Sequence, residues 1–211
     1  MNLPNKLTIS RIALVPFILA FMLPISLFKE TSPWNVFIHD YGMIIAVVLF
    51  GLASLTDTMD GQIARKRGIV TNMGKFLDPI ADKLLVTSVL IALVQLNRIT
   101  AWIAIIVISR EFIVTGIRLL AADKNVVISA SNIGKIKTVV QIIAILLIMI
   151  NVQLSITVSN FTGELSNIQS LMGKSLPFME SLSGVALFLA VVLTLVSGYD
   201  YIKKNLHYIK E

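Results

Sequence analysis

The sequence contains no cysteine, and charged residues make up only 14% of the chain. The absence of cysteine excludes disulfides, thiolate catalysis and zinc or iron–sulfur sites that need cysteine ligands. The charged fraction is low against roughly a quarter in soluble domains, and hydrophobic types reach 56%. We therefore expect the chain to have lipid rather than water as its solvent.

The sequence contains several long hydrophobic runs. A bilayer-spanning helix needs about 20 mostly apolar residues, and six runs approach or reach that length. They lie near 12–28, 42–56, 77–97, 100–122, 136–158 and 182–202. Six spans and short loops would use nearly all 211 residues. The prediction is an all-α integral membrane protein, a bundle of about six transmembrane helices forming one domain over 1–211.

The segments between the runs give further expectations. The second run is short, so its helix is extended to about Arg67. The five residues from Leu96 to Thr100 predict a tight helical hairpin, and 125–132 a linker. The segment from about 159 to 181 is rich in Ser, Asn and Gly and is expected to be an external loop. Residues 2–10 predict a short interfacial helix at the N-terminus.

The basic residues fix an expected orientation. All but three of the eighteen Lys and Arg residues fall on one side of the predicted spans, and the exceptions are Lys29, Arg98 and Lys174. Positively charged loops stay on the cytoplasmic side, so both termini and the charged segments below are expected to face the cytoplasm from the cell membrane. The positive residues form no stripe or run, which argues against a nucleic-acid partner.

Four aspartates stand at the edges of two of these helices. Asp57 and Asp60 are three residues apart, and Asp78 and Asp82 are four apart, so each pair projects from one helical face. Acidic groups near a membrane are costly and usually functional. Hard oxygen ligands favour Mg²⁺, Mn²⁺ or Ca²⁺, and Mg²⁺ usually shares its shell with substrate phosphate. Helix capping and salt bridges to neighbouring Lys and Arg residues are the structural alternative.

The residues between the aspartates favour phosphate chemistry. Gly61 and Gly74 each lie one turn from an aspartate and would clear space for a ligand, although close helix packing explains a single glycine as well. Arg65 follows one turn after Gly61, where its guanidinium could pair with a diphosphate.

This stretch matches the pattern D-x2-D-G-x2-A-R-x8-G-x3-D-x3-D at every fixed position. It resembles the signature of the CDP-alcohol phosphatidyltransferase family. The resemblance implies a six-helix membrane fold, the CDP-alcohol phosphotransferase fold, that is commonly a homodimer and holds two divalent ions, Mg²⁺ or Mn²⁺. It also implies a transferase of phospholipid biosynthesis that uses CDP-diacylglycerol and membrane lipid.

The resemblance also implies residue roles, position by position. Asp57, Asp60, Asp78 and Asp82 match the metal ligands, and Asp82 also matches the proposed general base. The positions that match contacts to the nucleotide, in addition to Asp57, are Gly61, Ala64, Arg65 and Thr71. Thr58 stands where an aromatic residue is frequent. The implied reaction is displacement at the phosphorus that bears the diacylglycerol, with CMP leaving.

A second cluster of cations bears on the acceptor. Arg110 and Arg118 are eight residues apart on one predicted helix, and Lys135 and Lys137 open the next. Cations beyond those that the nucleotide needs suit an acceptor that carries its own phosphate, such as glycerol 3-phosphate or inositol phosphate. The alternatives are that Arg110 pairs with Glu111 or that its side chain extends to the interface.

Words outside the motif favour one acceptor. N-L-P-N-K-L-T-x-x-R, S-R-E-F, T-G-x-R-L-L and G-K-I-K-T-x-x-Q resemble the branch of the family whose acceptor is glycerol 3-phosphate. Asn5 and Thr8 in the first word are candidate nucleotide contacts, with helix capping as the equal alternative. Tyr199 and Tyr201 are consistent with interfacial anchoring, and no chemistry is assigned to them.

Three other functions stay open at this point. Within the family, a cardiolipin synthase of this type would use a lipid acceptor. Outside it, a divalent-cation transporter could also place carboxylates among membrane helices, although such sites lie near the midplane and these acids lie at the membrane edge. A non-catalytic scaffold is disfavoured by the intact motif.

Overall fold

The structure is a computed structural model that describes residues 3–24, 32–67, 72–123, 126, 128, 131–160 and 166–205. Within the helices, it leaves the side chains of 3–7, 57–67, 72–79, 82, 166–172 and 174 undescribed.

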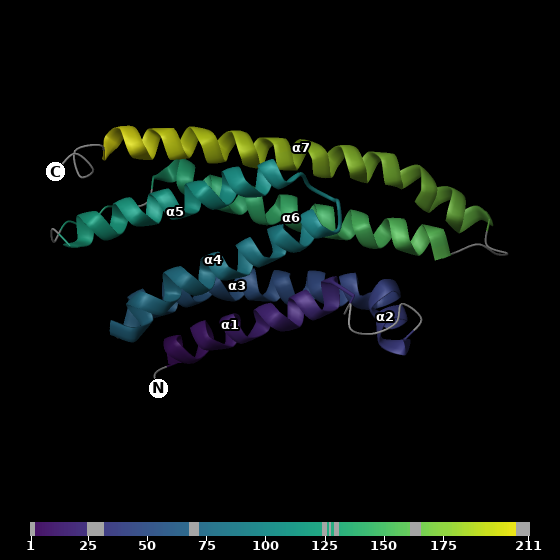
Figure 1. The fold of residues 1–211 in the computed structure, drawn as a ribbon, viewed down its shortest axis with the longest axis horizontal. Helices are drawn as coiled ribbons and strands as arrows, with labels where there is room; N and C mark the ends of the chain where they lie inside the picture. Colours follow the sequence, from purple (N-terminus) through teal and green to yellow (C-terminus); the bar gives the residue numbers. More distant parts are fainter. Residues whose placement is uncertain are drawn as a thin grey trace.

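Six long helices lie side by side in an elongated bundle (Figure 1). They are α1 (Leu3–Met22), α3 (Met43–Arg67), α4 (Asn72–Gln95), α5 (Ala101–Asp123), α6 (Asn132–Asn160) and α7 (Ser166–Lys204). A short helix, α2 (Pro33–Phe37), and a π-helical turn, η1 (Ile38–Gly42), lead into α3. No strand occurs in the described part of the chain. The predicted all-α bundle is therefore confirmed.

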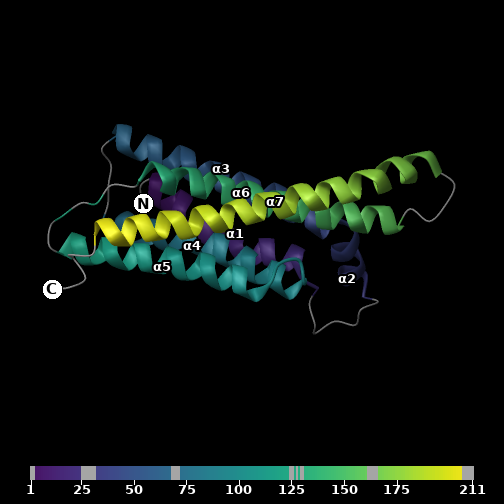
Figure 2. The same cartoon turned by 90° about the horizontal axis from the view of Figure 1, so that it is seen from above.

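The helices alternate in direction along the bundle. In both views, α1 begins and α7 ends at the same end, which also holds the last turns of α5 and the first turns of α6 (Figures 1 and 2). We call this the terminal end. The segment α2 lies at the opposite end (Figure 1).

Composition marks the bundle as an integral membrane protein. Three helices are long and apolar enough to cross a bilayer, Pro33–Thr56, Asn132–Asn160 and Ser175–Lys204, and Thr8–Met22 and Lys83–Gln95 are shorter apolar helices. Helix α5 has 23 residues but carries Arg110, Glu111 and Arg118 within its first 18. Charges inside a membrane helix are expensive unless they have partners or line a cavity.

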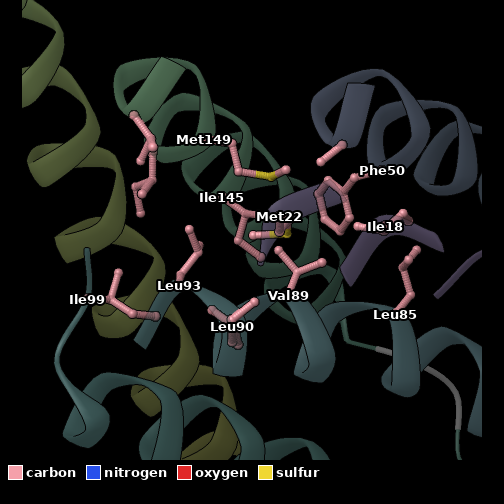
Figure 3. Packing of buried hydrophobic residues seen from close by; sticks show 14 of the residues in the cluster. Ile18, Met22, Phe50, Leu85, Val89, Leu90, Leu93, Ile99, Ile145 and Met149 are labelled. Carbon is pink, nitrogen blue, oxygen red and sulfur yellow. The ribbon is translucent and has the colours of Figure 1, made fainter. Parts of the chain in front are cut away.

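The core is built mainly from α1, α3, α4 and α6. Ile18, Phe50, Leu93, Ile145 and Met149 are buried and point toward one another (Figure 3). Helix α1 packs against both α3 and α4, and α6 packs against α7 and α3. This packing holds the two helices that carry the aspartates on a common support.

The N-terminal segment is continuous with the first span. Residues 3–10, predicted as a separate interfacial helix, are the first turns of α1. Pro4 lies in the first turn, where a missing amide hydrogen is tolerated, and no break follows it before Pro16.

The external loop predicted for 159–181 is wrong. Helix α6 continues to Asn160, and α7 begins at Ser166 and runs for 39 residues through Pro177. Ser, Asn and Gly have weak helix propensity, but propensity is a weak prior that tertiary contacts override, and α7 packs extensively against α6.

Two other boundaries follow the prediction, whereas α1 ends at Met22, short of the predicted 28, and α4 begins at Asn72, before the predicted 77. Helix α3 ends at Arg67, and five residues separate the end of α4 at Gln95 from the start of α5 at Ala101. Asn97 has a φ of 56°, and the amides of Asn97 and Arg98 donate to the carbonyls of Val94 and Leu93, each at 2.9 Å. These bonds form a Schellman motif, which stops α4 and reverses the chain. The hairpin is confirmed. The linker predicted at 125–132 falls between the end of α5 at Asp123 and the start of α6 at Asn132, and only residues 126, 128 and 131 of that interval are described.

Candidate active site

The aspartate motif occupies the end of α3 and the first half of α4. Asp57 and Asp60 lie in α3, and Asp78 and Asp82 lie in α4, so each pair is separated by about one turn of real helix. The side chains of these aspartates, and those of Asn5, Gly61, Ala64 and Arg65, lie outside the described residues, as does Thr71. No cluster of metal-binding residues occurs among the side chains that are described.

The residues of the motif nevertheless fit a hard divalent cation. Each helix brings two carboxylates on adjacent turns, and the sequence supplies neither cysteine nor histidine beside them. Such an oxygen-only donor set is what Mg²⁺, Mn²⁺ and Ca²⁺ prefer.

A cavity of about 170 Å³ lies among α4, α5, α6 and α7. Among the described residues that line it, four are cations and Glu111 is the one carboxylate. The cations are Lys83, Arg110, Arg118 and Lys135. Three of these are predicted acceptor-binding residues. Lys83 directly follows Asp82 in α4, so the cavity adjoins the aspartate-bearing helix.

Arg110 is held by several neighbours. Its Nη2 donates to Ser197 Oγ at 3.0 Å, and its Nη1 lies 3.4 Å from Glu111 Oε1. Its Nε is buried and has no hydrogen-bond partner among the described residues. Two glycines leave room for this side chain, because a Cβ at Gly198 would lie 3.0 Å from Arg110 Cγ and one at Gly134 would lie 3.7 Å from Arg110 Nη2. Arg110 therefore carries an unused donor beside a cationic cavity.

Arg118 makes two contacts with one tyrosine. Its Nε donates to Tyr201 Oη at 3.2 Å, and its Cζ lies 5.5 Å from the centre of the Tyr201 ring. Tyr201 is buried, whereas Tyr199 is 70% exposed. Of the two tyrosines near the end of α7, Tyr201 therefore lines the cavity, and Tyr199 is exposed as expected for a residue at the membrane interface.

Lys137 is placed apart from the other three predicted acceptor residues. Its side chain is buried and forms an ion pair with Glu111 Oε1. It lines a separate cavity of about 40 Å³, together with Gln141, Glu111 and Lys83. The structure therefore brings Arg110, Arg118 and Lys135 together and gives Lys137 a neighbouring position behind Glu111.

Thr8, a candidate nucleotide contact, is buried on α1 with Arg11 one turn later. Both lie on the helix that packs against α3 and α4.

Sequence reasoning missed several residues of the cavity. The sequence marks Lys83 only as one of the cations next to the aspartates, and it gives no sign of a role for Ser197 or Tyr201. The available signal was the spacing of four between Ser197 and Tyr201, which puts both on one face of α7. Which helix that face meets is visible only in the fold.

These features, a six-helix membrane bundle with the aspartate motif across α3 and α4, define the class to which the protein belongs. The chain is a member of the CDP-alcohol phosphatidyltransferase family, whose family model matches residues 1–196. Members of this family generally use a divalent metal.

The chain is similar to particular proteins along nearly its whole length. It is 42% identical to the CDP-diacylglycerol–glycerol-3-phosphate 3-phosphatidyltransferase of Bacillus subtilis (strain 168), covering 97% of this chain and 95% of that protein. It is 34% identical to the enzyme of the same name from Rickettsia bellii (strain RML369-C), covering 96% and 94%. It is also 33% identical to a probable phosphatidylglycerophosphate synthase of Mycobacterium tuberculosis (strain CDC 1551 / Oshkosh), covering 97% and 82%.

Proposed function

We propose that this protein is a phosphatidylglycerophosphate synthase. It transfers the phosphatidyl group from CDP-diacylglycerol to sn-glycerol 3-phosphate and releases CMP. The observation that carries the proposal is the cavity at which Arg110, Arg118 and Lys135 converge with Lys83, the residue after Asp82. The names and near-complete coverage of the relatives from Bacillus subtilis and Rickettsia bellii support the same reaction.

The charge of the cavity favours an acceptor that brings its own phosphate. The described lining residues include four cations and one carboxylate, Glu111, which already contacts Lys137 and Arg110. Neither Arg118 nor Lys135 has a carboxylate partner among the described residues, so their charges are available to a ligand. An arginine fork can bind phosphate oxygens in pairs, and Lys135 and Lys83 add point charges. A glycerol 3-phosphate bound by its phosphate would keep its primary hydroxyl free to react.

The proposed reaction is a displacement at phosphorus. The primary hydroxyl oxygen of glycerol 3-phosphate forms a bond to the phosphorus that carries diacylglycerol, and the bond from that phosphorus to the diphosphate oxygen breaks. CMP leaves, and Asp82 accepts the hydroxyl proton. Arg110, Arg118, Lys135 and Lys83 bind and orient the acceptor, so that positioning contributes to the rate. Arg65, with Gly61, Ala64, Thr71, Asn5 and Thr8, binds the nucleotide.

Asp57, Asp60, Asp78 and Asp82 would hold two divalent ions, Mg²⁺ or Mn²⁺. When bound, such ions neutralise diphosphate charge and stabilise attacking and leaving oxygens in a displacement.

We further propose that the whole chain is one domain in the cell membrane, as a homodimer, with both termini and the site at the cytoplasmic face. The terminal end of the bundle collects the helix ends richest in Lys and Arg, which is the pattern of a cytoplasmic face. A cardiolipin synthase would take a lipid as its acceptor. A small, positively charged cavity suits a small phosphorylated acceptor better than a lipid. No feature of the described residues supports the transporter alternative.

An acceptor panel tests the reaction. Purified protein in detergent would receive CDP-diacylglycerol with Mg²⁺ or Mn²⁺ and one of four acceptors: glycerol 3-phosphate, inositol phosphate, serine or phosphatidylglycerol. We expect CMP release with glycerol 3-phosphate to exceed that with each other acceptor. Equal release with serine or phosphatidylglycerol would refute the assignment.

A further inference from the structure

We propose that Ser197 and Tyr201 of α7 are positioning residues, which fix Arg110 and Arg118 in the orientation that binds the acceptor phosphate. The inference rests on the proposed function and adds a role for α7, a helix that lies outside the aspartate motif. Helix α7 would then set the affinity of the enzyme for the phosphorylated acceptor.

The two residues form one face of α7. They are four positions apart, so their side chains lie above one another on the helix, and both are buried, with exposures of 0% and 4%. Arg110 and Arg118 face them from α5, and α5 and α7 pack directly together. Each arginine thus meets one neutral hydrogen-bond acceptor: Arg110 meets Ser197, and Arg118 meets Tyr201.

Tyr201 restrains Arg118 in two ways at once. Its hydroxyl accepts from Nε, and its ring lies beside the guanidinium carbon. A guanidinium also carries Nη1 and Nη2, and the structure gives Arg118 no other polar contact with a described residue. Tyr201 therefore occupies one edge and one face of the Arg118 guanidinium, and the two terminal nitrogens, Nη1 and Nη2, are left for a phosphate.

Ser197 restrains Arg110 with a hydroxyl whose direction is fixed. Ser197 Oγ donates to the Thr194 carbonyl at 3.2 Å, which leaves its lone pairs for Arg110 Nη2. The small volume of Gly198 allows α7 to approach the Arg110 side chain closely.

Neutral partners have a specific consequence. A carboxylate would orient Arg118 but would also cancel its charge, whereas the Tyr201 hydroxyl orients it and leaves the charge for a ligand. Arg110 also lies 3.4 Å from Glu111 Oε1, but Glu111 is shared with the buried Lys137 and so neutralises only part of the Arg110 charge. An arginine that is already ordered loses less side-chain freedom when it binds phosphate. Loss of Ser197 or Tyr201 should therefore weaken acceptor binding and leave binding of CDP-diacylglycerol unchanged.

Steady-state kinetics with each substrate varied in turn tests the proposal. The variants are Tyr201→Phe, which keeps the ring, Tyr201→Leu, which removes both contacts, and Ser197→Ala. Tyr199→Phe and Tyr199→Leu are the matched controls, because Tyr199 lies two residues from Tyr201 on the same helix and is exposed. The unfolding temperature of each variant is measured in the same detergent.

We expect the KM for glycerol 3-phosphate to rise about fivefold in Tyr201→Phe and Ser197→Ala and about thirtyfold in Tyr201→Leu. The value of kcat and the KM for CDP-diacylglycerol should stay within about twofold of the wild-type values. The proposal is overturned if the variants match the Tyr199 controls, or if both KM values and kcat change together. Should Tyr201→Leu fail to fold, the two conservative variants decide.

A double-mutant cycle shows whether Tyr201 acts through Arg118. In an Arg118→Ala background, Tyr201→Phe should raise the KM for glycerol 3-phosphate no further. If Tyr201→Phe raised this KM by the same factor in the Arg118→Ala background as in the wild-type protein, Tyr201 would act independently of Arg118. A wild-type protein that releases no CMP with glycerol 3-phosphate would instead sink the proposed function, so the two failures are distinguishable.

Discussion

The four cations of the cavity differ in what holds them. Arg110 and Arg118 have neutral partners on α7, whereas Lys135 is exposed and its side chain forms no hydrogen bond or ion pair with the part of the chain that the structure describes. The nearby Lys137 is buried against Glu111. Substitutions at these positions should therefore separate acceptor binding from folding.

Lys135→Ala should weaken acceptor binding without destabilising the fold. The substitution removes a cation from the cavity and leaves no carboxylate without a partner. We expect the KM for glycerol 3-phosphate to rise about tenfold, as for the loss of one charged contact. Lys203→Ala is the control, because Lys203 is an exposed lysine on α7 outside the cavity lining. Equal KM values for the two variants would contradict the placement of Lys135.

Glu111→Ala should act on stability instead. It removes the Glu111 carboxylate from its ion pair with the buried Lys137 ammonium, and breaking a buried pair costs about 3 kcal/mol. Asp200→Ala is the control, since Asp200 pairs with an exposed lysine, Lys204, at 2.9 Å, and such pairs contribute about 0.5 kcal/mol. Denaturant unfolding in detergent measures both. A smaller loss of unfolding free energy for Glu111→Ala than for Asp200→Ala would show that the ion pair does not support the fold.

Sequence patterns could predict which charged residues lie near the membrane edge. They could not predict which of these residues pair with each other. Lys135 and Lys137 look equivalent in the sequence, and only the three-dimensional fold shows that Lys137 pairs with Glu111. Ser197 and Tyr201 lie in an apolar run near a helix end, where a tyrosine suggests an interfacial anchor. Tyr199 is exposed as such an anchor would be, whereas Tyr201 turns inward.

Among the elements, boundaries set by local chemistry were predictable and those set by packing were not. The turn at 96–100 follows from short-range backbone bonds around Asn97, a residue type that tolerates the left-handed conformation. The start of α7 at Ser166 does not follow from its composition, because its Ser, Asn and Gly residues disfavour a helix in isolation.

The hairpin gives a prediction at this scale. Asn97→Val should destabilise the protein by about 2 kcal/mol, because a left-handed backbone is strained for a β-branched residue. Asn97→Gly should be neutral or slightly stabilising, since glycine adopts this conformation freely. Thermal unfolding in detergent compares the two variants. If both lowered the unfolding temperature equally, the side chain of Asn97 rather than its backbone conformation would control the turn.

Across the whole molecule, the number and direction of the helices were predictable because each span is an apolar run of suitable length. The positions of the spans relative to one another were not, because lateral packing depends on side-chain shape. The common end at which α1 begins and α7 ends agrees with the even number of spans (Figure 1).

The absence of native cysteine makes this topology easy to test. Val126→Cys places a thiol in the α5–α6 connection, and Arg98→Cys places one in the α4–α5 hairpin. In intact cells, a maleimide that cannot cross the membrane should label Arg98→Cys and not Val126→Cys. Permeabilised cells should allow labelling of both. The reverse pattern would invert the proposed orientation.

Incorporation of labelled glycerol 3-phosphate into lipid tests the proposed chemistry most directly. With CDP-diacylglycerol and Mg²⁺ or Mn²⁺, purified protein should form one labelled lipid for each CMP released, and both products should be lost with a chelator or in Asp82→Asn. CMP release without label in lipid, or undiminished transfer after the divalent ions are removed, would contradict a metal-assisted transfer to glycerol 3-phosphate.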